Sequence, residues 1–275
     1  MWVNHKGNFY IKIFKNKIKI KEKKMKKLIA LLLVISLAIF AITGCDSITP
    51  PPNGEEGEGE GEGEGEEEVK QVVLMEAFVA EGCAYCAIVE PHLEQLAEEY
   101  SKDEMILVEV IPWLGYVTPQ GIERYDWYGL AGGTPQILVN GLVYSPLTGT
   151  ASYSTIKSRI EAQLNATPKV SIQATRTEIG GTSTISGTIK NISDTALSNL
   201  VINGMAFKKR GDFPYAVTNI FEEEKFEVSS LAVGESKDFT IILENINWDG
   251  QRLDGVIFVQ ETTGKKIVRQ SLFID

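Results

Sequence analysis

The chain has 275 residues, of which 43% are apolar and 23% are charged, a balance typical of globular proteins and sufficient for one or two domains. Residues 1–44 carry ten Lys and one Glu, whereas residues 45–275 carry 17 Lys and Arg against 36 Asp and Glu. Because its main part is so acidic, we expect no nucleic-acid partner.

A basic and then apolar segment at the start is typical of an export signal. Residues 28–42 form an apolar run that only Ser36 interrupts. It is short for a membrane-spanning helix, which needs about 20 residues, but it suits the apolar region of a signal peptide. Since Met25 and two lysines form a complete basic start for such a signal, we expect translation to begin there. The alternative is a genuine basic cytoplasmic tail.

The apolar run ends in Ile42-Thr43-Gly44-Cys45, which resembles the bacterial lipobox. The resemblance implies that the signal, residues 1–44, is cleaved and that Cys45 carries the lipid. Two or more acyl chains would anchor the protein stably. We therefore predict an extracytoplasmic lipoprotein on a bacterial membrane, at the cell surface or the periplasmic face. The alternative is an uncleaved signal anchor with an incidental cysteine.

Residues 45–69 are expected to form a disordered linker. They include the run "PPPNGEEGEGEGEGEGEEE", in which glycines alternate with glutamates after three prolines. Glycine has no side chain to bury and the glutamates repel one another, so no core can form. The segment is predicted to hold the folded part away from the membrane.

Residues 70–166 read as alternating strands and helices. The run 71–80 is apolar enough for a strand that is covered on both faces. A helix with one buried stripe follows, marked by apolar residues at helical spacing: Val89, Leu93, Leu96 and Tyr100. Further elements are expected in this order: a strand over 105–111, a short helix near 120–128, strands 136–139 and 142–144 around an Asn140-Gly141 hairpin turn, and a helix after Ser152 or Ser154.

Residues 167–275 change to β-branched residues, alternation and turn signals, without a convincing helix. This pattern predicts an all-β, immunoglobulin-like sandwich. The candidate strands are 169–178, 182–191, 197–209, 236–245, 253–261 and 266–274.

The segment "EGCAYC" holds two of the three cysteines and is the candidate site. Cys83 is expected at the first turn of a helix, where unpaired N–H groups and the helix dipole favour a thiolate. Cys86, one turn later, would then be the buried partner that resolves a mixed disulfide.

Two other interpretations of the pair are weaker. A structural zinc site needs four ligands, but the exported part offers only these thiols and His92, which lies about 240° around the helix from Cys86. We therefore expect no metal. A purely structural disulfide would close a loop too short to stabilise the fold much.

The predicted order of strands and helices, with the cysteine pair at the first helix, resembles the thioredoxin fold. Pro91 matches a helix-kinking proline, and residues 128–141 are similar to the segment of that family around its cis-proline. The resemblance implies a cis Thr134-Pro135 bond beside the cysteines, with backbone free to pair with an extended substrate. An ordinary trans proline at an edge strand is the alternative.

The resemblance also assigns neighbouring residues. Tyr85 would be an exposed ring at the substrate surface. Gly82 replaces the usual tryptophan, and Ala77 stands where a buried acid is expected. Glu76 is one position away: it would serve as the proton acceptor for Cys86 if it turned inward, and would otherwise face solvent.

The fold class expected from this resemblance is an α/β thioredoxin-like domain followed by the sandwich. The implied function is thiol-disulfide exchange, with Cys83 as nucleophile, Cys86 as resolving thiol, and no cofactor beyond the redox-active disulfide. Its partners would be exported protein thiols or disulfides and a membrane electron donor or acceptor. The direction of electron flow stays open, with reduction slightly favoured.

Two further functions were weighed. The first is a surface binding protein in which the sandwich engages a partner and the thioredoxin-like part is scaffold. The second, peroxide reduction or copper delivery, is weaker because no extra ligand or base is visible near Cys83.

Overall fold

The structure, a computed structural model, describes residues 69–275. The predicted signal, Cys45 and acidic linker lie outside these residues. The first elements are β1 (Val73–Phe78), α2 (Cys86–Glu99), β2 (Met105–Val110), α3 (Pro119–Tyr128), β3 (Gln136–Val139), β4 (Leu147–Thr148) and α4 (Tyr153–Leu164). The others are β5 (Val170–Ile179), β6 (Thr182–Asn191), β7 (Leu197–Arg210), β8 (Phe213–Ile220), β9 (Phe226–Leu231), β10 (Ser236–Glu244), α5 (Trp248–Gln251), β11 (Asp254–Glu261) and β12 (Val268–Ile274).

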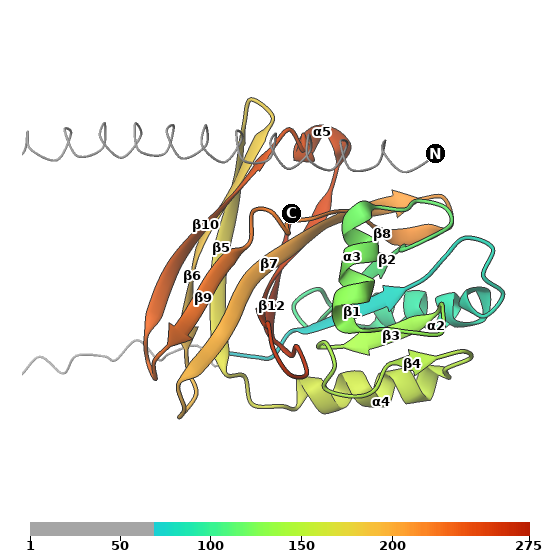
Figure 1. Cartoon of the computed structure of the whole chain (residues 1–275), viewed down its shortest axis with the longest axis horizontal. Helices are drawn as coiled ribbons and strands as arrows, with labels where there is room; N and C mark the ends of the chain where they lie inside the picture. The colour runs from blue at the N-terminus through green and yellow to red at the C-terminus, as the bar shows by residue number, and fades with distance from the viewer. Residues whose placement is uncertain (1–68) are drawn as a thin grey trace, which may run out of the picture. The chain divides into compact units, whose positions relative to one another are not determined.

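A nine-stranded mixed sheet runs through most of the structure. Its strand order is β12-β11-β7-β8-β2-β1-β3-β4, and β9 pairs with β7 beside this path. Strand β8 is antiparallel to β7 and parallel to β2, with Ala216 opposite Glu109. Figure 1 shows the strands of both halves of the chain side by side at this junction.

The predicted fold class, a thioredoxin-like α/β domain followed by a separate immunoglobulin-like sandwich, was wrong. The structure is mostly β, and the strands of residues 70–166 continue into β8, β7, β11 and β12 instead of ending as a sheet of their own. Only β10, β6 and β5 form a second sheet. The physical reason is β8, which the sequence reading did not predict and which pairs with the free edge of β2. The boundary predicted between residues 166 and 167 falls in the connection from α4 to β5.

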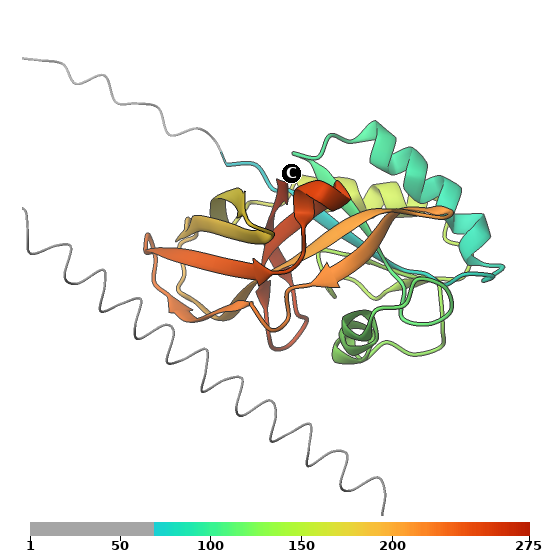
Figure 2. The same cartoon turned by 90° about the horizontal axis from the view of Figure 1, so that it is seen from above.

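Helices cover the β1–β2 part of the sheet on both faces (Figure 2). One core joins β1 to α2 and α4 through apolar side chains that include Met75, Val89, Leu93, Ile156 and Ile160. The other joins the opposite face of β1 to α3, through Leu74, Phe78, Tyr125 and Tyr128. A third core packs the three-stranded sheet against β7, β9 and β11.

The Asn140-Gly141 turn is present, but the strand after it differs from the prediction. Both residues have positive φ, as a tight turn requires. Strand β3 pairs with β4 at 147–148, and of residues 142–144 only Leu142 forms an isolated bridge, to Val139. The reason is that Leu142 donates its N–H to the Lys265 carbonyl over 3.1 Å, so the chain leaves the sheet before it returns.

Candidate functional site

The two cysteines are joined by a disulfide at the end of β1. Gly82, with φ of +71°, turns the chain out of the strand, and Cys86 is the first residue of α2. Cys83 is half-buried and Cys86 is buried. The Cys86 N–H, which has no acceptor within the helix because it belongs to the first turn, donates to the Cys83 Sγ over 3.2 Å.

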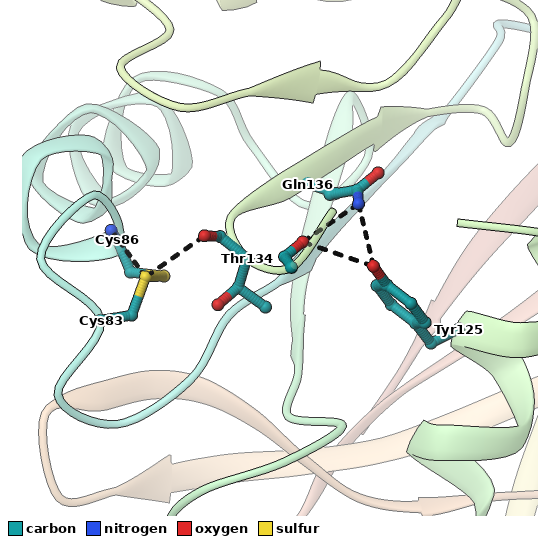
Figure 3. Close-up of a disulfide and its surroundings, with 6 residues drawn as sticks. Cys83, Cys86, Tyr125, Thr134 and Gln136 are labelled. Carbon is teal, nitrogen blue, oxygen red and sulfur yellow. Dashed lines mark hydrogen bonds between the residues drawn. A yellow bond between two sulfur atoms is a disulfide. The ribbon is translucent and has the colours of Figure 1, made fainter. Parts of the chain in front are cut away.

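The Thr134-Pro135 bond is cis and lies beside this disulfide, so the predicted cis bond is confirmed. The Cys83 Sγ is 3.4 Å from the Thr134 carbonyl oxygen (Figure 3). Behind this carbonyl the Gln136 amide donates to the Gly133 carbonyl and to the Tyr125 hydroxyl, both over 3.0 Å. Helix α3 and strand β3 thus hold the loop that faces the sulfur.

Large apolar side chains are exposed at the same end of the sheet. Tyr85 and Ile88 lie at the start of α2 with 58% and 50% of their surface exposed, and Leu114 is 66% exposed. The Leu114 carbonyl accepts from the Glu81 N–H over 3.2 Å, which joins the loop after β2 to the cysteine turn. We call the set Cys83, Tyr85, Ile88, Leu114 and Thr134 the disulfide face.

Glu76 is not brought to the cysteines. Successive residues of β1 point to opposite faces of the sheet. Ala77 belongs to the core that contains Cys86. Leu74 and Phe78, which share a face with Glu76, belong to the core with α3 on the opposite face. Glu76 is fully buried there and forms an ion pair with Arg124. The expected proton acceptor of Cys86 is therefore on the other face of the sheet.

A closed polar cluster surrounds that ion pair. The Arg124 Nη2 donates to Glu76 over 3.0 Å, to the Tyr128 hydroxyl over 3.0 Å and to the Gln260 side chain over 3.2 Å. Burial works to lower the pKa of Arg124, but the Glu76 carboxylate outweighs it and raises this pKa, so the guanidinium stays charged. Burial also raises the pKa of Tyr128, which donates to Glu76 over 2.6 Å.

Glu109 is the buried acid that the sequence reading missed. It lies on β2 directly opposite Ala77, on the sheet face that packs against α2, and is 1% exposed. Burial raises its pKa to about 8, although the Tyr215 N–H, which donates to it over 2.8 Å, acts in the opposite direction. A glutamate within the apolar run "MILVEVI" was the signal that could have revealed it.

Residues 69–275 contain no group of three or more His, Cys, Asp and Glu side chains that could hold a metal ion. The His92 Nδ1 lies 3.3 Å from the Ala151 carbonyl oxygen. In the same part of the chain, no helix is both long and apolar enough to cross a membrane.

Comparison with known proteins gives a fold match but no family. The sequence matches no protein-family model and none of the curated proteins. Among solved structures, HBP35 of Porphyromonas gingivalis is similar with a TM-score of 0.60 and 17% identity, over 74% of each chain. The β-glucosidase 3B of Thermotoga neapolitana matches with a TM-score of only 0.29 and 13% identity, over 62% of this chain and 21% of that one.

The match with HBP35 overturns the expected oxidoreductase. The chain shares its fold with HBP35 across both predicted halves, and this match does not support assignment as a thioredoxin-like thiol-disulfide oxidoreductase. The prediction of that family, activity and enzyme class was therefore wrong. The structure adds a physical reason, because Glu76, the acid expected to serve Cys86, is held in an ion pair on the far side of the sheet.

Proposed function

We propose that this chain is a lipid-anchored, extracytoplasmic binding protein whose disulfide face receives an extended segment of an exported polypeptide. The anchor is Cys45, which follows the lipobox-like residues 42–44. The observation that carries the binding role is the group of large apolar side chains, including Tyr85 and Ile88, exposed around a rigid loop.

Exposed apolar residues that cluster at one end of a molecule mark interaction sites more often than scattered ones do. Tyrosine suits such a site because it buries a large ring at a low entropic cost. The disulfide, together with the hydrogen bonds from the Gln136 amide to Gly133 and Tyr125, holds the backbone next to these side chains, which reduces the entropy lost on binding.

An extended polypeptide fits this surface better than a small molecule. Its main chain can pair with the backbone near Thr134, and alternate side chains can contact the apolar residues. Residues 69–275 have an excess of acidic over basic residues, so an apolar segment without net negative charge is the expected partner.

The test uses the full chain in mild detergent and fluorescently labelled insulin B chain as probe. The cysteines of the probe are alkylated with iodoacetamide, which adds no charge, so that only non-covalent binding contributes to the fluorescence anisotropy. Ile88→Ala should weaken binding about tenfold, as expected for an anchor residue.

Ile242→Ala is the matched control, because Ile242 is also 50% exposed but lies on β10, outside the disulfide face. It should leave the affinity unchanged. Absence of binding by the parent, or equal affinities for the two variants, would contradict the proposed function.

A further inference from the structure

A cavity of about 600 Å³ lies at the edge of α3, away from the disulfide face. It is open to solvent on one side and is lined by the last turns of the helix, by strands β7, β9 and β11, and by the turn before β9. Its lining includes Arg124, Trp127, Asn203, Glu222, Lys225 and Gln260. Binding sites for small molecules are commonly of this size and combine an apolar wall with a few fixed polar groups.

The floor of the cavity carries polar side chains on an otherwise apolar sheet face. Asn203 on β7 and Gln260 on β11 are 3% and 1% exposed, respectively. Asn203 lies opposite Phe258 in the strand pairing, so Gln260 is its diagonal neighbour on the same face. Burying amides costs free energy unless they form hydrogen bonds, and both are bonded within the protein: the Gln260 amide donates to the Tyr128 hydroxyl and the Lys266 carbonyl, and the Asn203 Oδ1 accepts from the Gly204 N–H. They make this part of the cavity floor polar.

The guanidinium of Arg124 is fixed with one edge free. Its Nε and Nη2 atoms bond to the buried cluster of Glu76, Tyr128 and Gln260. Within residues 69–275, Nη1 makes no such hydrogen bond, and Arg124 lines the cavity. Because Nε and Nη2 are bonded to the buried cluster, the planar guanidinium is fixed, and its Nη1 is pre-organised to donate to an oxygen of a ligand.

The charged residues around the cavity are two ion pairs and one further acid. Arg124 is paired with Glu76, Lys225 is paired with Glu222 at the mouth, and Glu227 on β9 also lines the cavity. The Asn203 Nδ2 donates to Glu222 over 3.1 Å and retains a second hydrogen for a ligand. A bound molecule therefore needs hydrogen-bonding groups of both kinds and no negative charge.

Trp127 supplies a flat apolar wall. Its ring is half-buried, and the Lys266 Nζ lies 4.5 Å from the ring centroid and donates to the Trp127 carbonyl. The ring is thus held in one orientation at the cavity. Indole rings pack well against the C–H faces of sugar rings, while amides, carboxylates and arginine bond to their hydroxyl groups.

We infer that this cavity binds a neutral saccharide of one or two sugar rings, with Trp127 against the ring face and Arg124, Asn203 and Glu222 bonding to its oxygens. This site is separate from the disulfide face and goes beyond the proposed function.

The experiment is calorimetric titration of the full chain in mild detergent with glucose, N-acetylglucosamine, cellobiose and chitobiose. Glycine and inorganic phosphate test the competing classes, a zwitterion and an anion. At least one sugar should bind with saturation. Trp127→Ala should weaken this binding at least about tenfold, which corresponds to about 1.4 kcal/mol.

Trp113→Ala is the matched control. Like Trp127, Trp113 is half-buried and packs edge-on against a tyrosine of α3. The ring centroids of Trp113 and Tyr125 are 4.8 Å apart, and those of Trp127 and Tyr128 are 5.0 Å apart. Trp113 does not line the cavity. The Trp113→Ala variant should bind the sugar with the same affinity as the parent. Glu222→Gln, a half-buried turn residue, gives a second variant in case Trp127→Ala does not fold, and it should also weaken binding.

Three results would overturn the inference: no saturable binding of any of the four sugars, tighter binding of glycine or phosphate than of every sugar, or a sugar affinity that Trp127→Ala and Glu222→Gln leave at the parental value.

Discussion

Glu109 lies within the sheet, and no cationic partner is found for it among residues 69–275. Besides the Tyr215 N–H, the charged groups that influence it are Glu90 and Glu94 of α2, and both act to raise its pKa. Its pKa of about 8, against 4.5 as the ordinary value, means that the folded protein keeps Glu109 protonated at neutral pH.

Stability should therefore fall as the pH rises through this range. Between pH 4.5 and about 8 the unfolded chain releases the proton of Glu109 while the folded chain retains it, so each pH unit costs up to about 1.4 kcal/mol. Glu109→Gln keeps the size and shape of the side chain but has no proton to release, so its stability does not fall with pH in this way. We expect it to gain on the order of 3 kcal/mol over the parent between pH 5 and pH 8, as measured by urea unfolding.

Glu104→Gln serves as the control, because the pKa of Glu104 is shifted in the opposite direction to that of Glu109. Hydrogen bonds from the Ser101 N–H and hydroxyl lower the pKa of Glu104, so its carboxylate stabilises the fold above pH 4.5. This variant should lose stability relative to the parent as the pH rises to about 5, with no further change between pH 5 and pH 8. If Glu109→Gln follows the parent at both pH values, Glu109 is not held neutral in the folded protein.

At the scale of elements, α3 is tied to the sheet by charge as well as by packing. The Arg124–Glu76 ion pair has both side chains at 5% exposure or less. Removing one partner of such a pair leaves the other charge buried alone, which costs about 3–5 kcal/mol. Glu76→Gln should therefore lower the free energy of unfolding by about this amount, as measured by urea titration.

A double variant separates the charge effect from packing. Glu76→Leu with Arg124→Met replaces both charges with apolar groups of similar length, and buried pairs often tolerate such replacement. It should be more stable than Glu76→Gln alone. If the double variant is less stable than Glu76→Gln, the altered packing around α3 costs more free energy than leaving the Arg124 charge buried without its partner.

Local patterns predicted most elements but not their pairing. The helix after Cys86 and the strands with clear alternation were predicted within a few residues, since their side chains alternate between core and solvent. Strand β8 was missed because it contains Pro214 and does not alternate. Its partner Glu109 is more than a hundred residues earlier, and no local signal encodes that pairing.

The same limit holds for the sites. Cys83, Cys86 and the cis bond before Pro135 lie in short motifs that can be found in the sequence. The cavity instead combines Arg124 from α3 with Asn203 and Gln260 from strands far along the chain. Such a convergence depends on the sheet order, which the sequence reading predicted incorrectly.

At the scale of the molecule, the continuous sheet implies that residues 69–275 unfold together. The β2–β8 pair lies in the middle of the sheet, and the Glu109 carboxyl group accepts from the Tyr215 N–H across it. Loss of either half would expose the apolar face and the unpaired edge of the other, so neither half is expected to persist alone.

Fluorine-labelled tryptophan can test this cooperativity. Trp113 reports on the half that carries the cysteines, and Trp248, buried in the core between the three-stranded sheet and the large sheet, reports on the other half. Their resonances should disappear at the same urea concentration. Ser152→Ala removes the side-chain cap of α4 and should lower both midpoints together, by about 1 kcal/mol in free energy. A shift of the Trp113 midpoint alone would mean that the two halves unfold independently despite the shared sheet.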